Sequence, residues 1–182
     1  WDLHTVDEGF GSIDEEGRYE IVGQYSAISI RRDDGRPGIA YFAQAGHRGG
    51  SVRTELRFAQ ATTALPRSKN DWRFMVIDEA VALRPTDEDP ILIPNGVGLF
   101  AAVARGPDHL PVVAYYDRQL GALKLARYDR ATDEFAAPAI LAEGEARDDD
   151  VGWYPAVAVD SQGEAHVSYK DATRDDLLYV NT

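Results

Sequence analysis

The sequence contains an internal repeat, and this feature limits the folds available to the chain more than any other. Three segments align, namely Gly23–Ala43, Gly98–Asp117 and Gly152–Asp171. In each segment a glycine is followed two residues later by an aromatic residue, which is Tyr25, Phe100 or Tyr154. An alanine, a polar turn with glycine, and a small residue before tyrosine follow in the same order. Self-similarity of this kind indicates that one structural unit recurs along the chain.

Short apolar runs complete each unit. The aligned pairs of runs are followed by a third run, "ELRFA", "LKLARY" or "LLYV", and in two units by a fourth, Trp72–Asp78 and Glu134–Leu141. The runs are rich in Val, Ile, Tyr, Phe and Ala, and Gly, Pro, Asp and Asn separate them. Such runs predict short antiparallel strands. No apolar spacing typical of a helix lasts beyond about ten residues, so the sequence predicts an all-β fold.

Four strands per unit predict a β-propeller built from four-stranded antiparallel blades. The segment "WDLHTVDEG" at the N-terminus matches "WRFMVIDEA" at Trp72–Ala80, so the chain opens on a fourth strand. We therefore expect one propeller region over residues 1–182. Its parts are the outer strand of a blade, two full blades and three strands of a blade, at residues 1–7, 23–78, 98–141 and 152–182.

This count amounts to three blades, whereas propellers have roughly four to eight. We expect the chain to form part of a six- or seven-bladed ring. Another chain, or the remainder of the same polypeptide, would complete that ring and cover the strand edges left open.

The segment "GWYPAVAVDSQGEAHVSYKDATRDDLLYV" resembles a propeller repeat of bacterial secreted and surface proteins. In the broad sense it is similar to the repeats of the sialidase-like (BNR-repeat) superfamily. The resemblance implies a propeller fold and a secreted or cell-surface location. It does not extend to the Asp-box of true sialidases, Ser-x-Asp-x-Gly-x-x-Trp, which no repeat carries. No arginine recurs at one position of all three units, which argues against a sialidase site.

Acidic residues are concentrated in three long connections. Residues 7–22, 77–98 and 141–151 together carry 16 acidic and three basic residues, whereas the net charge of the whole chain is −12. In a propeller these connections share one face with the connections between second and third strands, and that face usually carries the binding site. Such charge disfavours nucleic acid and favours cations or basic partners. No apolar run is long enough for membrane insertion.

Two pairs of residues end matching second strands beside these connections. Tyr116-Asp117 and Lys170-Asp171 are candidate ligand contacts, as an aromatic platform and a carboxylate are in sugar sites. The alternative is that each aspartate caps a hairpin turn through the backbone. His47 and Arg48 lie in an inserted loop and are candidates to contact an anionic group.

One acidic run is a candidate metal site. Asp148, Asp149 and Asp150 offer carboxylate oxygens on a loop, as Ca²⁺ requires, although they lack the ordering of a dedicated calcium loop. The alternative is a solvated acidic loop. The chain has no cysteine and no His-x-x-x-His pair, so neither a thiolate nor a histidine metal site is expected.

These features favour a non-catalytic binding or assembly module of a secreted or cell-surface protein, with a protein or carbohydrate partner. No catalytic residue is assigned. One alternative is a glycosidase- or lyase-type enzyme whose site is shared with missing blades. The other is a structural subunit that completes a ring with another chain.

Overall fold

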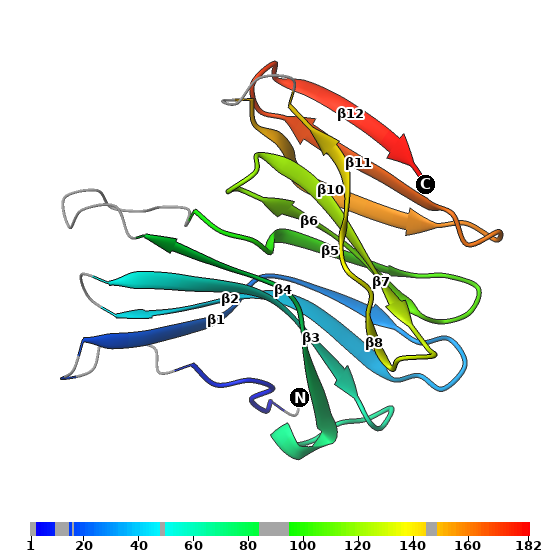
Figure 1. Cartoon of the computed structure of the whole chain (residues 1–182). Coiled ribbons are helices and arrows are strands. Elements are labelled where there is room, and N and C mark those ends of the chain that lie inside the picture. The colour runs from blue at the N-terminus through cyan, green and yellow to red at the C-terminus, as the bar shows by residue number, and fades with distance from the viewer. Residues whose placement is uncertain (1–2, 10–14, 16, 48–49, 84–94, 145–148) are drawn as a thin grey trace.

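The computed structural model describes residues 3–9, 15, 17–47, 50–83, 95–144 and 149–182. Its strands all pair antiparallel and form three sheets (Figure 1). Within these residues the one helical element is a single 3-10 turn, Lys69–Asp71, and no helix could span a membrane. The prediction of an all-β fold is confirmed.

The first sheet contains four strands in chain order, because a hairpin joins each strand to the next. They are β1 (Arg18–Ile30), β2 (Pro37–His47), β3 (Ser51–Ala61) and β4 (Trp72–Leu83). Both outer strands extend beyond the predicted bounds of 23 and 78. The sheet otherwise contains the four runs expected for one unit.

The second sheet repeats this order, except that its last strand is divided. The strands are β5 (Leu99–Arg105), β6 (Pro111–Asp117), β7 (Ala122–Asp129), β8 (Glu134–Phe135) and β9 (Ala139–Glu143). Both β8 and β9 pair with β7. The sequence predicted one run over Glu134–Leu141, but Pro138, which has no N–H to donate, lies in the gap between the two strands.

The third sheet has three strands in the described residues, β10 (Val151–Val159), β11 (Ala165–Asp171) and β12 (Asp176–Asn181). The strand expected over residues 1–7 is not formed in the part of that range that is described, residues 3–7. A strand needs a partner edge, and no strand of the described residues pairs with residues 3–7. The segment packs instead on the first sheet, where Val6 contacts Tyr41 and its neighbours.

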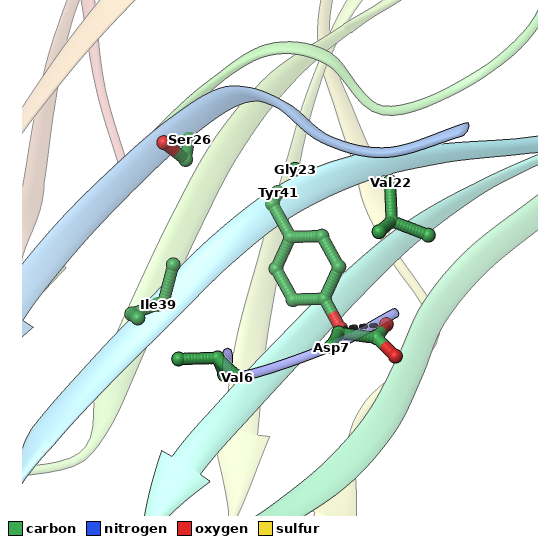
Figure 2. A pocket seen from close by; sticks show the side chains of 7 residues that line it. All are labelled: Val6, Asp7, Val22, Gly23, Ser26, Ile39 and Tyr41. Atoms are coloured by element: carbon green, nitrogen blue, oxygen red, sulfur yellow. Dashed lines mark hydrogen bonds between the residues drawn. The ribbon is translucent and has the colours of Figure 1, made fainter. Parts of the chain in front are cut away.

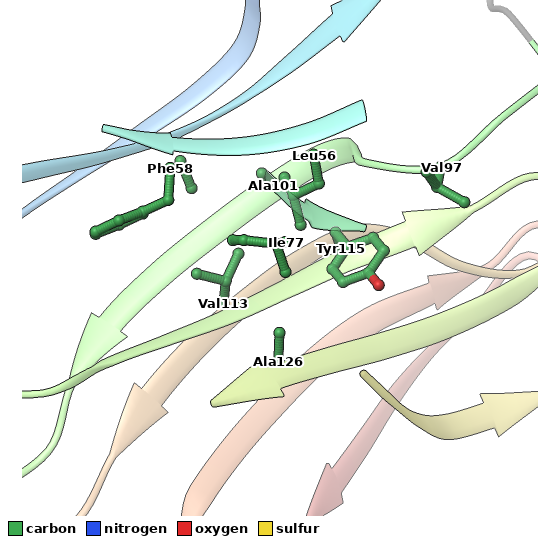
Figure 3. Packing of buried hydrophobic residues seen from close by; sticks show 9 residues of the cluster. Leu56, Phe58, Ile77, Val97, Ala101, Val113, Tyr115 and Ala126 are labelled. Carbon is green, nitrogen blue, oxygen red and sulfur yellow. The ribbon is translucent and has the colours of Figure 1, made fainter. Parts of the chain in front are cut away.

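Apolar side chains fill the space between the first and second sheets (Figure 3). Leu56 and Phe58 of β3 are fully buried against Val113 and Tyr115 of β6. A buried leucine or phenylalanine side chain contributes about 1.5–3 kcal/mol relative to an exposed one. This cluster therefore holds the two sheets together.

A second cluster of the same kind joins the second sheet to the third. Leu123 and Leu125 of β7 pack against Val167 and Tyr169 of β11. All seven residues of β6 are buried, since this strand has a sheet on both of its faces. Burial on both faces explains why the sequence of this strand is an apolar run without polar alternation.

The three sheets lie one above the next, so the first and third form the two ends of the stack (Figure 1). The first strands of successive sheets contact one another, β1 with β5 and β5 with β10. The hairpins that join first to second strands all lie on one side of the stack. The turns between β6 and β7 and between β11 and β12 lie on the opposite side (Figure 1).

Candidate functional site

Each first strand carries the same irregularity near its beginning. The strand pairing shifts register after Val22 and Gln24 in β1, and equivalent shifts follow Leu99 in β5 and Trp153 in β10. At this point the repeat glycine and the aromatic residue two positions later both have positive φ. The aromatic residues are Tyr25, Phe100 and Tyr154, with φ of 52°, 55° and 49°.

A left-handed backbone at a bulky residue costs on the order of 1–3 kcal/mol. The chain adopts this conformation at the equivalent position of all three sheets, so the surrounding structure imposes it each time. The bulge turns the aromatic side chain out of the strand alternation. Its consequence is that three rings from three sheets meet.

The rings form a continuous row. The ring centroids of Tyr25 and Phe100 are 4.8 Å apart, and those of Phe100 and Tyr154 are 4.3 Å apart. Behind them Trp153 contacts both Phe100 and the buried ring of Tyr116. This support fixes the orientation of the row.

An open pocket of about 470 Å³ lies along this row. Its lining consists of the three aromatic residues and the residue that follows each of them, which are Ser26, Ala101 and Pro155. Tyr154 is 59% exposed, so one ring presents much of its surface to solvent. Among the described residues no charged side chain lines the pocket, and the phenols of Tyr25 and Tyr154 belong to its lining. The pocket can therefore offer ring faces and phenol hydroxyls to a neutral ligand.

The predicted contact pair Tyr116-Asp117 lies below the surface. Both residues are almost completely buried. The Tyr116 hydroxyl donates to the carboxylate of Asp150. Asp117 accepts the backbone N–H groups of Gln119 and Leu120, and it pairs with Lys124 at 3.0 Å. Asp117 thus caps its hairpin turn, and Tyr116 supports the aromatic row from behind.

The second predicted pair has the same local geometry. Asp171 is buried and accepts the backbone N–H groups of Thr173 and Arg174. Burial opposes ionisation of Asp171, but these bonds and the Arg174 guanidinium lower its pKa overall. Lys170 pairs with Asp175 at 2.6 Å. The structure does not bring these residues together with Tyr116 and Asp117 in one pocket.

The remaining predicted residues are only partly described. Arg48 and Asp148 lie outside the described residues, and for His47 the backbone alone is described, at the end of β2. Asp149 lies 3.5 Å from Arg174. Among the described residues no three carboxylates or histidines are grouped as a metal would require. The calcium site remains a prediction.

A charged cluster lies beside a smaller pocket of the first sheet, and Figure 2 shows the side chains that line this pocket. The Tyr41 hydroxyl donates to Asp7 at 2.7 Å, and Arg57 pairs with Asp7, Glu20 and Glu55 at 2.6–3.1 Å. The pocket beside it has a volume of about 210 Å³ and is lined largely by apolar residues, including Val6, Val22 and Ile39. Asp7 is the one carboxylate among the described residues of this lining.

The equivalent cluster joins the first sheet, through Asp78, to the second sheet. Tyr115 donates to Asp78 at 2.5 Å, and Lys124 lies 2.7 Å from Asp78. Burial raises the pKa of Tyr115, and the Asp78 carboxylate raises it further. Tyr41 shows the same direction for the same two reasons, with Asp7 as its acceptor. Because the Tyr–Asp–cation contact recurs between elements, it belongs to the repeat and holds neighbouring units together.

The sequence therefore identified the aromatic residues as repeat markers but not as a candidate site. Their separation of several tens of residues gives no local motif. The available signal was that each follows a repeat glycine at the same spacing, which marks a recurring backbone conformation that glycine favours. No model of a known protein family matches the chain, and a search of curated proteins finds no significant match.

Proposed function

We propose that this chain is a non-catalytic binding module of the β-propeller type, whose ligand contacts the row formed by Tyr25, Phe100 and Tyr154. Three antiparallel sheets, stacked through equivalent residues with their first strands adjacent, support the propeller arrangement. The observation that carries the binding proposal is the strained aromatic position shared by all three sheets.

The chemistry of the pocket favours a carbohydrate. Ring faces bind the apolar C–H face of a sugar, and phenol hydroxyls can exchange hydrogen bonds with sugar hydroxyls. The described part of the lining carries no charge, which favours a neutral sugar over an anionic one. Phe100 and Tyr154 also follow shortly after two of the acidic connections in the sequence, and these would repel anionic ligands. The repeat resembles those of secreted and cell-surface proteins, and a protein at that location would encounter such ligands.

The enzyme alternative lacks a comparable observation. Glycoside hydrolysis uses two carboxyl groups that flank the scissile bond. The described residues that line the aromatic pocket include no carboxylate, and Asp7 in the smaller pocket is paired with Arg57 and Tyr41. Binding is therefore the function that the described residues support best.

Calorimetric titration with a panel of neutral oligosaccharides tests this function. We expect at least one sugar to bind, and Tyr154→Ala to weaken its binding about tenfold, because a stacked ring contributes roughly 1 kcal/mol or more. Ile140→Ala is the matched control, since Ile140 is 46% exposed but lies in the outer strand β9. Absence of binding across the panel, or an equal loss in the control, would contradict the proposal.

A further inference from the structure

The two interfaces between sheets share one contact between a leucine and a glycine. Leu56 of the first sheet lies against Gly98 of the second, where an added methyl group would be 2.9 Å from the Leu56 Cα. Leu123 of the second sheet lies against Gly152 of the third, where the methyl group would be 2.6 Å from the Leu123 backbone nitrogen. Both leucines are fully buried. Glycine thus leaves the space that the preceding sheet occupies.

The strand register identifies one more leucine at this position. In the first two sheets the leucine pairs with the residue that follows the repeat tyrosine, Phe42 for Leu56 and Tyr116 for Leu123. In the third sheet that residue is Lys170, and its partner is Leu177. Leu177 is 82% exposed. Its neighbour on the same face, Tyr179, is 60% exposed, whereas the equivalent Phe58 is fully buried. This face of the third sheet has the apolar residues of an interface but no sheet on it within the described chain.

The first sheet has open space at the glycine that would receive such a leucine. Gly23 is equivalent to Gly98 and Gly152, with a φ of +86°, but an added methyl group there would meet nothing within 4 Å. The smaller pocket, of about 210 Å³, lies beside Gly23 (Figure 2). Ile28, which is 62% exposed, occupies the position at which Val103 packs against the first sheet. The described chain therefore holds one such glycine without its leucine.

The segment of residues 3–9 fits the same arrangement. The Tyr115 hydroxyl of the second sheet donates a hydrogen bond to Asp78, which lies in β4, the fourth strand of the preceding sheet. Asp7 accepts the hydroxyl of Tyr41 in the same way. The segment therefore lies on the first sheet where the fourth strand of a preceding sheet would lie. The third sheet has three described strands, and no described strand pairs with the outer edge of β12.

We propose that the third sheet of one copy of this chain packs on the first sheet of a second copy. Leu177 of one copy enters the pocket at Gly23 of the other, and residues 3–9 of the second copy lie along β12 of the first as its fourth strand. Both surfaces come from this one sequence, and the two interfaces within the chain provide their template.

Ring closure limits the size of this assembly. Two copies of the three described sheets make six, which lies within the roughly four to eight sheets of known propellers. The assembly is then a closed dimer with two equal interfaces. This inference rests on the propeller arrangement proposed above but not on the identity of any ligand.

Sedimentation equilibrium of the 182-residue chain tests the dimer. We expect a mass near twice 20.1 kDa at micromolar concentration. Leu177→Asp places a charge in the interface, and it should raise the dissociation constant about 30-fold or more. Leu120→Asp is its control, because Leu120 is also exposed but lies in the hairpin between β6 and β7.

The partner surface has its own matched pair of variants. Asparagine tolerates a left-handed backbone, so Gly23→Asn should fold and yet exclude Leu177, with a similar loss of dimer. Gly163→Asn is the control, since Gly163 also has positive φ and open space but lies in the hairpin between β10 and β11. A monomer at micromolar concentration, or a dimer that neither Leu177→Asp nor Gly23→Asn weakens, would overturn the proposal. Sugar binding is measured separately, and Tyr154→Ala should leave the mass unchanged.

A disulfide locates the exchanged segment. The chain has no cysteine of its own. In the first sheet Phe74 of β4 pairs with Ala59 of β3. If Asp7 is aligned with Asp78 and Leu177 with Leu56, the same pairing places Leu3 opposite Val180 of the other copy. We expect the double variant Leu3→Cys, Val180→Cys to form a covalent dimer on oxidation. The double variant Leu3→Cys, Leu120→Cys should stay uncross-linked, and cross-linking in this second variant alone would contradict the arrangement.

Discussion

One tyrosine position shows how the role of a residue depends on the unit that contains it. Tyr41, Tyr115 and Tyr169 occupy the same position in the second strands of their repeats. Tyr41 and Tyr115 each donate to an aspartate of a preceding element beside a cation from the third strand. At Tyr169 the aspartate and cation positions hold Ala142 and Leu178. The charged pair is thus replaced as a unit by apolar residues, which avoids an unpaired buried charge.

The Tyr115 hydroxyl provides a test at this scale. A hydrogen bond to a charged group contributes about 1.5–3 kcal/mol, so Tyr115→Phe should lower the free energy of unfolding in urea by about that amount. The pKa of Tyr115 is raised in the folded state, so its stabilising effect is full below the unfolded pKa of about 10 and is lost as pH rises above it.

The pH dependence separates this effect from a packing defect. We expect stability to fall less steeply above about pH 10 in Tyr115→Phe than in the parent chain, because one tyrosine with a raised pKa is gone. Leu120→Ala, an exposed change that removes no titrating group, should keep the parent slope. Identical slopes in all three proteins would show that Tyr115 does not carry the alkaline transition.

At the scale of the element, the bulge in each first strand determines both the aromatic row and the fit between sheets. Gly98 and Gly23 have nearly the same φ, +88° and +86°. The two positions differ in their surroundings, because Gly98 faces the backbone of Leu56 and Gly23 faces open space. The pair therefore separates backbone strain from packing against the neighbouring sheet.

We expect Gly23→Ala and Gly98→Ala to share a strain cost of about 1–2 kcal/mol from the left-handed backbone. Gly98→Ala should lose a further 1–3 kcal/mol or so, because the methyl group overpacks the interface with the first sheet. Urea denaturation of dilute protein measures both. Equal losses would mean that the second sheet moves away from Leu56 at little cost.

The sequence predicted the elements better than their details. Alternating runs and turn residues gave the three units, because strand formation follows apolar patterning and turn chemistry that are local in sequence. The division of the fourth strand at Pro138 and the meeting of Tyr25, Phe100 and Tyr154 depend on contacts between units, which no local pattern contains. For the same reason the match between residues 1–7 and the fourth strand predicted an outer strand that residues 3–7 do not form here, because strand pairing depends on an edge that another unit supplies.

At the scale of the whole molecule, the three sheets form a row, and clusters of buried residues join the first sheet to the second and the second to the third. In such an arrangement stability is approximately a sum of units and nearest-neighbour interfaces. The second sheet has two interfaces, whereas the first and third each have one open face within the described chain. The middle of the row should therefore be the most stable part.

Hydrogen exchange of the backbone amides measures this gradient directly. In dilute protein we expect the amides of β6 to exchange most slowly, since the strand is buried on both faces, and those of β12 to exchange much faster. Raising the protein concentration should slow exchange in β12, because a second copy covers its face and edge, while β6 changes little. Exchange in β12 that is independent of concentration would contradict the second copy as occupant, and uniform exchange across the sheets would contradict the nearest-neighbour description itself.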